Sequence, residues 1–229
     1  MASLVGENAL EERQIKPFRE VHASDLGSYS LQDEIASRGY LLIRDLLPQH
    51  TLSQVLRDIM RILYTAGRLV RDDDPLERMA DIGAACGDPD PSFKRTYQSV
   101  LNLESFHALP HHPALKQVMR RFIGENILIH PKPIGLLIFP RCERLVNRAH
   151  QDFRFMDGEL ECFTTWIPLH DCPTRLGPCR FWRALTGEGR TLESLVSRSP
   201  QRHPPIHSRS RRSMVQNMPN LATDTMILL

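Results

Sequence analysis

The tripeptide His150-Gln151-Asp152 is the feature that most narrows what this chain can fold into. Side chains alternate between the two faces of an extended strand, so His150 and Asp152 would point the same way. A metal ion would then meet one imidazole nitrogen and one carboxylate oxygen. With a second histidine from a distant strand, these ligands would form the facial triad of non-haem Fe(II) sites. Because so short a motif also occurs by chance, the rest of the chain has to be weighed with it.

Two stretches carry apolar residues at the spacing of a helix. Residues 52–63 form one stripe, with charged side chains such as Arg61 on the opposite face. Residues 115–123 form the other, which Gly124 should end. His111 and His112 stand at the entrance of this second helix. Adjacent histidines project in different directions, so we expect solvent-facing residues at a helix start rather than a metal site.

A short helix at 31–38 should end at Gly39, which leads into a buried strand at 40–43. The acidic run at 72–74, before Pro75, lacks the spacing of a calcium loop and favours a helix start and solubility. Apolar, β-branched composition predicts further strands, and Gly and Pro predict a loop. The strands are expected at 127–129, 135–139 and 163–169, and the loop at 83–95.

Several motifs surround His150-Gln151-Asp152 in a consistent order. Trp166-Ile167-Pro168-Leu169-His170-Asp171 has the form W-[IV]-x-L-x-[DE], followed by a turn at Leu176-Gly177-Pro178. Earlier matches are Gly39 to Pro48 (GYLLIRDLLP), His130-Pro131-Lys132-Pro133, and Leu136 to Pro140 (LLIFP). From about Gly39 to Gly177, the chain resembles the phytanoyl-CoA dioxygenase family of Fe(II)- and 2-oxoglutarate-dependent oxygenases.

The resemblance implies a mainly β fold with flanking helices, a double-stranded β-helix of the jelly-roll or cupin-like kind. It implies Fe(2+) as the metal, held by His150 and Asp152, and 2-oxoglutarate as cosubstrate. Trp166 would line the 2-oxoglutarate pocket, as would Leu136 on the preceding strand. No side chain would act as a catalytic acid or base, because the metal carries the chemistry. The substrate would be a small molecule.

After residue 182 the chain departs from the family pattern. Residues 221–229 resemble the family's last strand before its second iron-binding histidine and its 2-oxoglutarate arginine. Neither follows here, so the sequence predicts a jelly roll that is incomplete at the C-terminus, from a truncated gene product, a mispredicted gene model or a splice form. One alternative is a catalytically inactive remnant or binding module of the same fold. Another is an unrelated cupin-like barrel that recruits His203 or His207, both in a loose basic segment.

Composition sets the remaining expectations. The chain has 229 residues, a net charge of +2 and five cysteines without CxxC spacing, which fits one globular domain without a zinc site or disulfide framework. We expect an arm or short edge strand at 1–30, the oxygenase-like core at 31–182 and a divergent segment at 183–229. Neither nucleic acid nor a membrane is expected as a partner. With no visible signal peptide, the predicted location is cytoplasmic; the oligomeric state stays open.

Overall fold

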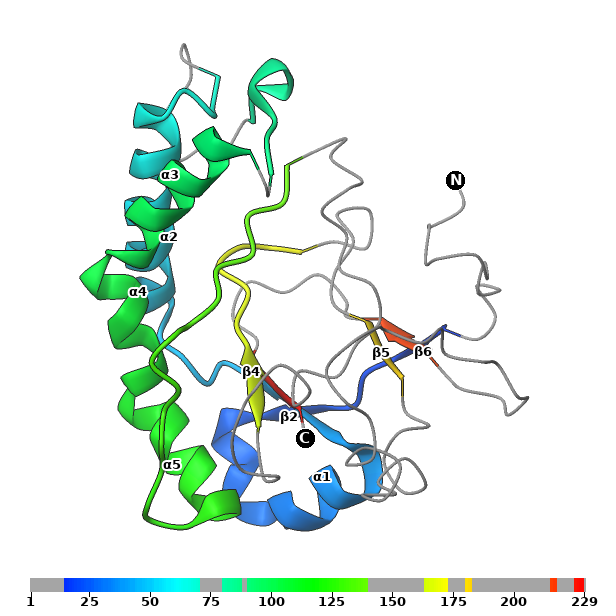
Figure 1. Ribbon diagram of the computed structural model, residues 1–229. Coiled ribbons are helices and arrows are strands. Elements are labelled where there is room, and N and C mark those ends of the chain that lie inside the picture. Colours follow the sequence, from blue (N-terminus) through cyan, green and yellow to red (C-terminus); the bar gives the residue numbers. More distant parts are fainter. Residues whose placement is uncertain are drawn as a thin grey trace, which may run out of the picture.

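The computed structural model describes residues 15–70, 80–87, 90–139, 163–172, 180–182, 215–217 and 225–228. A column of helices stands beside a group of short strands (Figure 1). In chain order the elements are β1 (Ile15–Pro17), β2 (Glu20–His22), η2 (Ala23–Ser28), α1 (Leu31–Arg38), β3 (Tyr40–Arg44), α2 (Gln49–Thr65), η4 (Ile82–Ala84), α3 (Pro91–Leu101), α4 (Glu104–Ala108), η5 (Leu109–His111), α5 (Pro113–Ile123), β4 (Thr164–Trp166), β5 (Arg180–Trp182), β6 (Val215–Asn217) and β7 (Thr225–Leu228).

Gly39 makes the turn from helix α1 into strand β3. The hydroxyl of Ser30 caps the start of α1 by accepting a hydrogen bond from the N–H of Asp33 at 3.4 Å. At the other end, Gly39 has a φ of 76°, in the left-handed region, and its N–H donates to the carbonyl of Ile35. All five residues of β3 are buried. The helix predicted at 31–38 and the buried strand at 40–43 are both confirmed.

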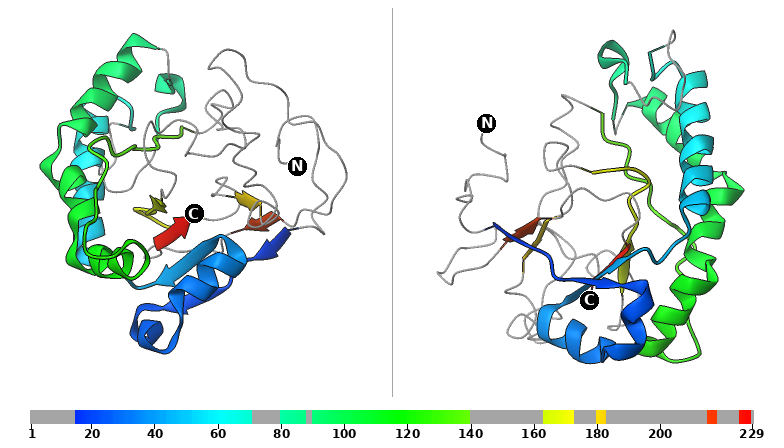
Figure 2. Two further views of the ribbon diagram at one scale, coloured as in Figure 1. Left: turned by 60° about the horizontal axis from the view of Figure 1, so that its bottom comes forward. Right: turned by 180° about the vertical axis from the view of Figure 1, so that it is seen from behind.

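Strand β7 lies between β3 and β4 in a four-stranded sheet of order β2-β3-β7-β4. β2 runs parallel to β3, whereas β7 is antiparallel to both of its neighbours. Tyr40 of β3 is in register with Leu228, and Trp166 of β4 is in register with Met226. Figure 2 (left) shows the red strand β7 between light-blue β3 and yellow β4. The sheet is therefore built from three distant parts of the sequence.

A second sheet has the order β1-β6-β5, with β1 parallel and β5 antiparallel to β6. β1 is an edge strand here and β2 is an edge strand of the four-stranded sheet. An arm or a short edge strand was expected within residues 1–30, and residues 15–17 and 20–22 form edge strands. β6 and β7, both from the 183–229 segment, pair with strands from the earlier parts of the chain.

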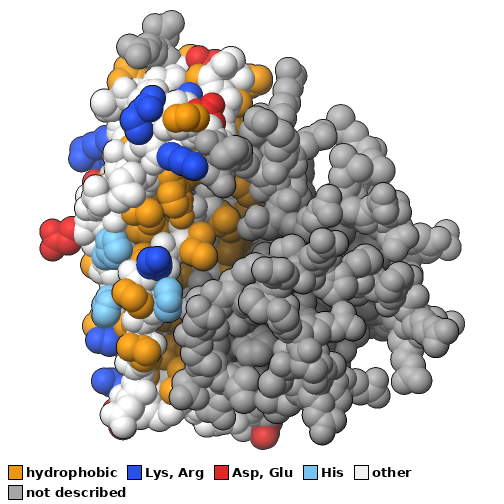
Figure 3. Space-filling view, in the orientation of Figure 1, with side chains coloured by type: hydrophobic (Ala, Val, Ile, Leu, Met, Phe, Trp, Pro, Cys, Tyr) orange, Lys and Arg blue, Asp and Glu red, His pale blue; other side chains and the backbone are white. Residues whose placement is uncertain are grey.

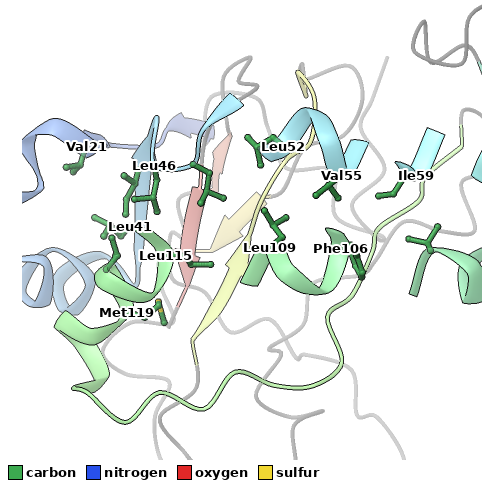
Figure 4. Close-up of a cluster of buried hydrophobic side chains, with 14 of the residues drawn as sticks. Val21, Leu41, Leu46, Leu52, Val55, Ile59, Phe106, Leu109, Leu115 and Met119 are labelled. Atoms are coloured by element: carbon green, nitrogen blue, oxygen red, sulfur yellow. The ribbon is translucent and has the colours of Figure 1, made fainter. Parts of the chain in front are cut away.

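The hydrophobic core lies where the helical column meets the four-stranded sheet (Figure 4). Helix α2 contributes one stripe of side chains, each at most 5% exposed: Leu52, Val55, Ile59 and Leu63. Leu41 and Val21 of the sheet and Leu115 and Met119 of α5 belong to the same cluster. Full burial of such a side chain stabilises the fold by about 1.5–3 kcal/mol. The apolar stripe predicted at 52–63 is confirmed as core packing.

The loop predicted at 83–95 is wrong from Pro91 onward, because helix α3 begins there. Asp90 is the N-cap residue, and its Oδ1 accepts a hydrogen bond from the N–H of Ser92 at 2.6 Å. A proline in the first helical position is favourable, since its missing N–H would have no helical partner anyway. The Asp-Pro pair is therefore a helix start that was mistaken for a loop.

Helix α5 begins and ends as the sequence predicted. Nδ1 of His112 accepts a hydrogen bond from the N–H of Ala114 at 3.3 Å, so this histidine caps the helix. Pro113 occupies the first turn. The helix ends at Gly124, whose φ of 92° is costly for other residues. The expected position at the helix start is confirmed, but His112 is half-buried and caps the helix, whereas a solvent-facing residue was predicted.

The strands predicted at 127–129 and 135–139 are wrong, because neither stretch pairs with a neighbour among the described residues. Residues 133–139 nevertheless alternate between the two sides of the chain: Leu137 and Phe139 pack on the core, whereas Leu136 and Ile138 are more than half exposed. Period-two burial is the property that suggested a strand. What is missing is the hydrogen-bonded partner, which depends on distant parts of the sequence.

Candidate functional site

Two of the four residues expected at the site lie within the described residues. Trp166 is the last residue of β4, and Leu136 lies on the extended segment that follows α5. The expected metal ligands, His150 and Asp152, fall outside the described residues, as do His203 and His207. The geometry of Trp166 and Leu136 is therefore what the structure contributes to the expected cosubstrate pocket.

Strand β4 has one side anchored to the helices. Phe163 stacks on Phe122 of α5, with ring centroids 5.5 Å apart and planes 29° apart. Phe163 and Ile167 both pack against the core cluster. Because side chains alternate along a strand, Thr164 and Trp166 point away from that cluster. Trp166 is half-buried and is not among the core residues.

Leu136 also points away from the helices. Its neighbours hold the chain against them: the N–H of Gly135 donates to the hydroxyl of Tyr97 at 3.1 Å, and Phe139 is 6% exposed. A Cβ on Gly135 would lie only 3.4 Å from the ring of Phe106, so the backbone runs close over α4. Leu136 itself is 54% exposed.

Trp166 and Leu136 come from different segments, and each points away from the core cluster. Neither belongs to the buried hydrophobic cluster of the described residues. Their neighbours in the chain do contact this cluster. Phe139, near Leu136, belongs to it, and Phe163, near Trp166, packs against it.

Several of the described histidines have local hydrogen-bonding roles. Nδ1 of His170 lies 2.6 Å from the carbonyl oxygen of Asp171, and Nδ1 of His130 accepts from the N–H of Lys132. His112 caps α5, as described above. Within the described ranges, no group of three or more His, Cys, Asp or Glu side chains is arranged to hold a metal ion.

Cys172 follows the matched motif on β4 and is half-buried. Burial raises the pKa of its thiol, because the charged thiolate is poorly solvated there. The thiol is therefore neutral near pH 7, which suits a packing role better than a nucleophile.

The sequence did not point to one further group, the arginines of a hollow between α2 and α3. Arg61, Arg68 and Arg95 line it. They come from three separate stretches of sequence, and one of them lies on the helix that was predicted as a loop. No local pattern joins them, so only the packing of α3 on α2 could have brought them to notice.

The chain matches no protein-family model, and a search of curated proteins finds no match to it. Among the described residues, no helix has both the length and the apolar character needed to cross a lipid bilayer.

Proposed function

We propose that this chain has the fold and site of an Fe(II)/2-oxoglutarate-dependent dioxygenase of the phytanoyl-CoA dioxygenase family. The observation that carries the proposal is the composition of the four-stranded sheet. β3, β4 and β7 come from the three motif regions at 39–48, 163–172 and 221–229, and they are adjacent in one sheet. Segments that resemble one family in sequence are expected to meet in this way if they share its core.

In this proposal His150 and Asp152 hold Fe(2+). An imidazole nitrogen and a carboxylate oxygen suit that ion as ligands. Bound Fe(2+) and 2-oxoglutarate together supply the oxidising chemistry. The chain's own side chains position the reactants: Trp166 and Leu136 form apolar walls on the side away from the helices, where they also exclude water.

A metal titration tests the ligand pair. We expect Fe(2+), added anaerobically, to bind with micromolar affinity, and we expect His150→Ala and Asp152→Ala to abolish that binding. His130→Ala is the matched control, because it removes an exposed imidazole whose Nδ1 accepts only a local backbone hydrogen bond. Equal binding in the wild type and in Asp152→Ala would remove the basis for the proposal.

Formation of succinate from 2-oxoglutarate separates an active enzyme from an inactive relative. We expect Fe(2+)-dependent succinate that Asp152→Ala does not form. Metal binding without succinate would instead favour the alternative, an inactive binding module of the same fold. Indole fluorescence gives a second readout, since the chain has two tryptophans and Trp166→Phe should remove any quenching by 2-oxoglutarate.

A further inference from the structure

A hollow of about 450 Å³ lies between the end of α2 and the first turns of α3. Arg61 comes from α2, Arg68 from the residues just after it and Arg95 from α3. No carboxylate lines this hollow within the described part of the chain. Figure 3 shows Lys and Arg side chains over the region of the helical column where α2 and α3 lie. The hollow is therefore a concave and positively charged feature.

Arg68 is the fixed member of the three. Its backbone N–H donates to the carbonyl of Leu63 at 2.8 Å, and its own carbonyl accepts from the N–H of Asp81 at 3.0 Å. Nη1 of its guanidinium donates to the carbonyl of Ala84 at 2.9 Å. Its Nε is buried and has no hydrogen-bond partner among the described residues. A buried donor is normally satisfied, so the Arg68 guanidinium keeps unused hydrogen-bonding capacity beside the hollow.

The hydroxyl groups that α3 contributes to the hollow already donate hydrogen bonds, whereas Thr65 of α2 adds a further hydroxyl. Ser92 donates to Asp90, Thr96 to the carbonyl of Ser92, and Ser99 to the carbonyl of Arg95. Recognition of an anion would therefore depend mainly on the guanidinium groups.

The nearby carboxylates leave this positive charge largely available. Asp58 lies 3.8 Å from Arg61, whose side chain is 68% exposed, so the pair is weak. Asp90 is engaged elsewhere: hydrogen bonds from the hydroxyl and N–H of Ser92 hold its pKa below the ordinary value, and Arg68 adds a smaller attraction. Neither carboxylate lines the hollow.

We propose that this hollow binds a small phosphorylated molecule, with Arg61, Arg68 and Arg95 around its phosphoryl group. Guanidinium groups recognise phosphate oxygens through paired, charge-assisted hydrogen bonds. The volume falls within the range of small-molecule sites, which leaves room for a body beside the phosphate. The proposal does not depend on the dioxygenase chemistry, because the hollow is formed by other elements than β4 and the segment that carries Leu136.

Calorimetry and phosphorus NMR with inorganic phosphate and phenyl phosphate, at low ionic strength, test this site. We expect saturable binding to the wild type that is about tenfold weaker in Arg95→Gln, because one charge-assisted contact is lost. Arg95 is exposed, so this variant should fold normally. Arg68→Gln should weaken binding at least as much. Arg120→Gln is the matched control and should bind like the wild type. It removes an arginine of α5 that pairs with Glu125, just after the helix.

Three results would overturn the proposal. The first is that neither probe binds the wild type. The second is that Arg95→Gln and Arg120→Gln bind as well as each other, which would mean nonspecific attraction to positive charge. The third concerns the acidic run 72–74, which follows Arg68 by a few residues in the sequence. If phosphate bound only after Asp72, Asp73 and Asp74 were all changed to Asn, the hollow would serve this run instead.

Discussion

Arg44 and Glu20 form a two-pronged ion pair that joins strand β3 to strand β2. Nε of Arg44 donates to Oε2 of Glu20 at 2.9 Å, and Nη2 donates to Oε1. Arg44 is 7% exposed, whereas about a third of the Glu20 side chain reaches solvent. The edge strand is thus held to the sheet by charge as well as by its backbone hydrogen bonds.

Glu20→Ala should lower the free energy of unfolding by about 2 kcal/mol, because it leaves a buried guanidinium without this counter-charge. Glu20→Gln keeps an acceptor oxygen and should cost less. Urea unfolding followed by circular dichroism measures both. Asp25→Ala, a change of one exposed carboxylate, is the control. Equal stability of Glu20→Ala and this control would show that the ion pair contributes nothing to the sheet.

Gly39→Ala should destabilise the chain by about 1 kcal/mol, because a φ of 76° places the new Cβ against the backbone. Gly27→Ala is the matched control, since its Cβ would meet nothing within 4 Å. Gly39→Asn should recover part of the loss, as Asn tolerates the left-handed region. The unfolding temperatures of the three variants test this prediction. A Gly39→Ala variant as stable as Gly27→Ala would contradict it.

The stability of the helical column should depend on pH through Asp58. The hydroxyl of Ser105 donates to Oδ2 of Asp58 at 2.7 Å and is the main reason that the pKa of this carboxyl lies below its ordinary 3.8. A lowered pKa in the folded state stabilises the fold above pH 3.8, and that contribution is lost as the pH falls through the folded-state pKa.

Ser105→Ala should therefore be less stable than the wild type near neutral pH, with a difference that shrinks in acid. Ser99→Ala is the control, because its hydroxyl donates to a backbone carbonyl that does not titrate. Unfolding free energies measured across the acid range give the two differences. A Ser105→Ala difference that is constant with pH would show that Asp58 does not carry the effect.

Leu136 and Phe139 should separate ligand binding from stability. Phe139→Ala removes a side chain that is 6% exposed and should cost about 3 kcal/mol. Leu136→Ala should change stability little, since Leu136 is 54% exposed, but it should weaken 2-oxoglutarate binding if Leu136 lines the pocket. Ile138→Ala, at 53% exposure, is the control for a general loss of apolar surface. Identical 2-oxoglutarate affinity in the two exposed variants would remove Leu136 from the proposed site.

Local signals in the sequence were enough to predict the helices at 31–38 and 115–123. Gly39 and Gly124 end them with positive φ, a property of one residue that needs no knowledge of the fold. Helix α3 was missed although its signals, Asp90 and Pro91, are equally local. Proline was interpreted as a breaker there, when its position after a capping residue makes it a first-turn residue.

Strand pairing was beyond local reasoning. Residues 135–139 have the alternation of a strand but no partner among the described residues, whereas residues 225–228 pair on both sides. Whether a segment becomes a strand depends on which distant segments pack next to it. The assembly of the whole sheet determines those neighbours. At the candidate site, the facing of Trp166 followed from alternation alone. The arginines of the hollow depended on how two helices pack, which no spacing in the sequence encodes.

The place of β7 sets an order of events during synthesis. Among the described residues, β3 and β4 share no hydrogen bonds and are joined in the sheet through Thr225–Leu228. During synthesis, β4 leaves the ribosome well before Thr225–Leu228. It can therefore pair in the sheet only after β7 has been synthesised. The helices that pack around α2 can fold before that point, because their contacts are local in sequence. Until β7 is available, β4 stays unpaired and is a binding site for a chaperone.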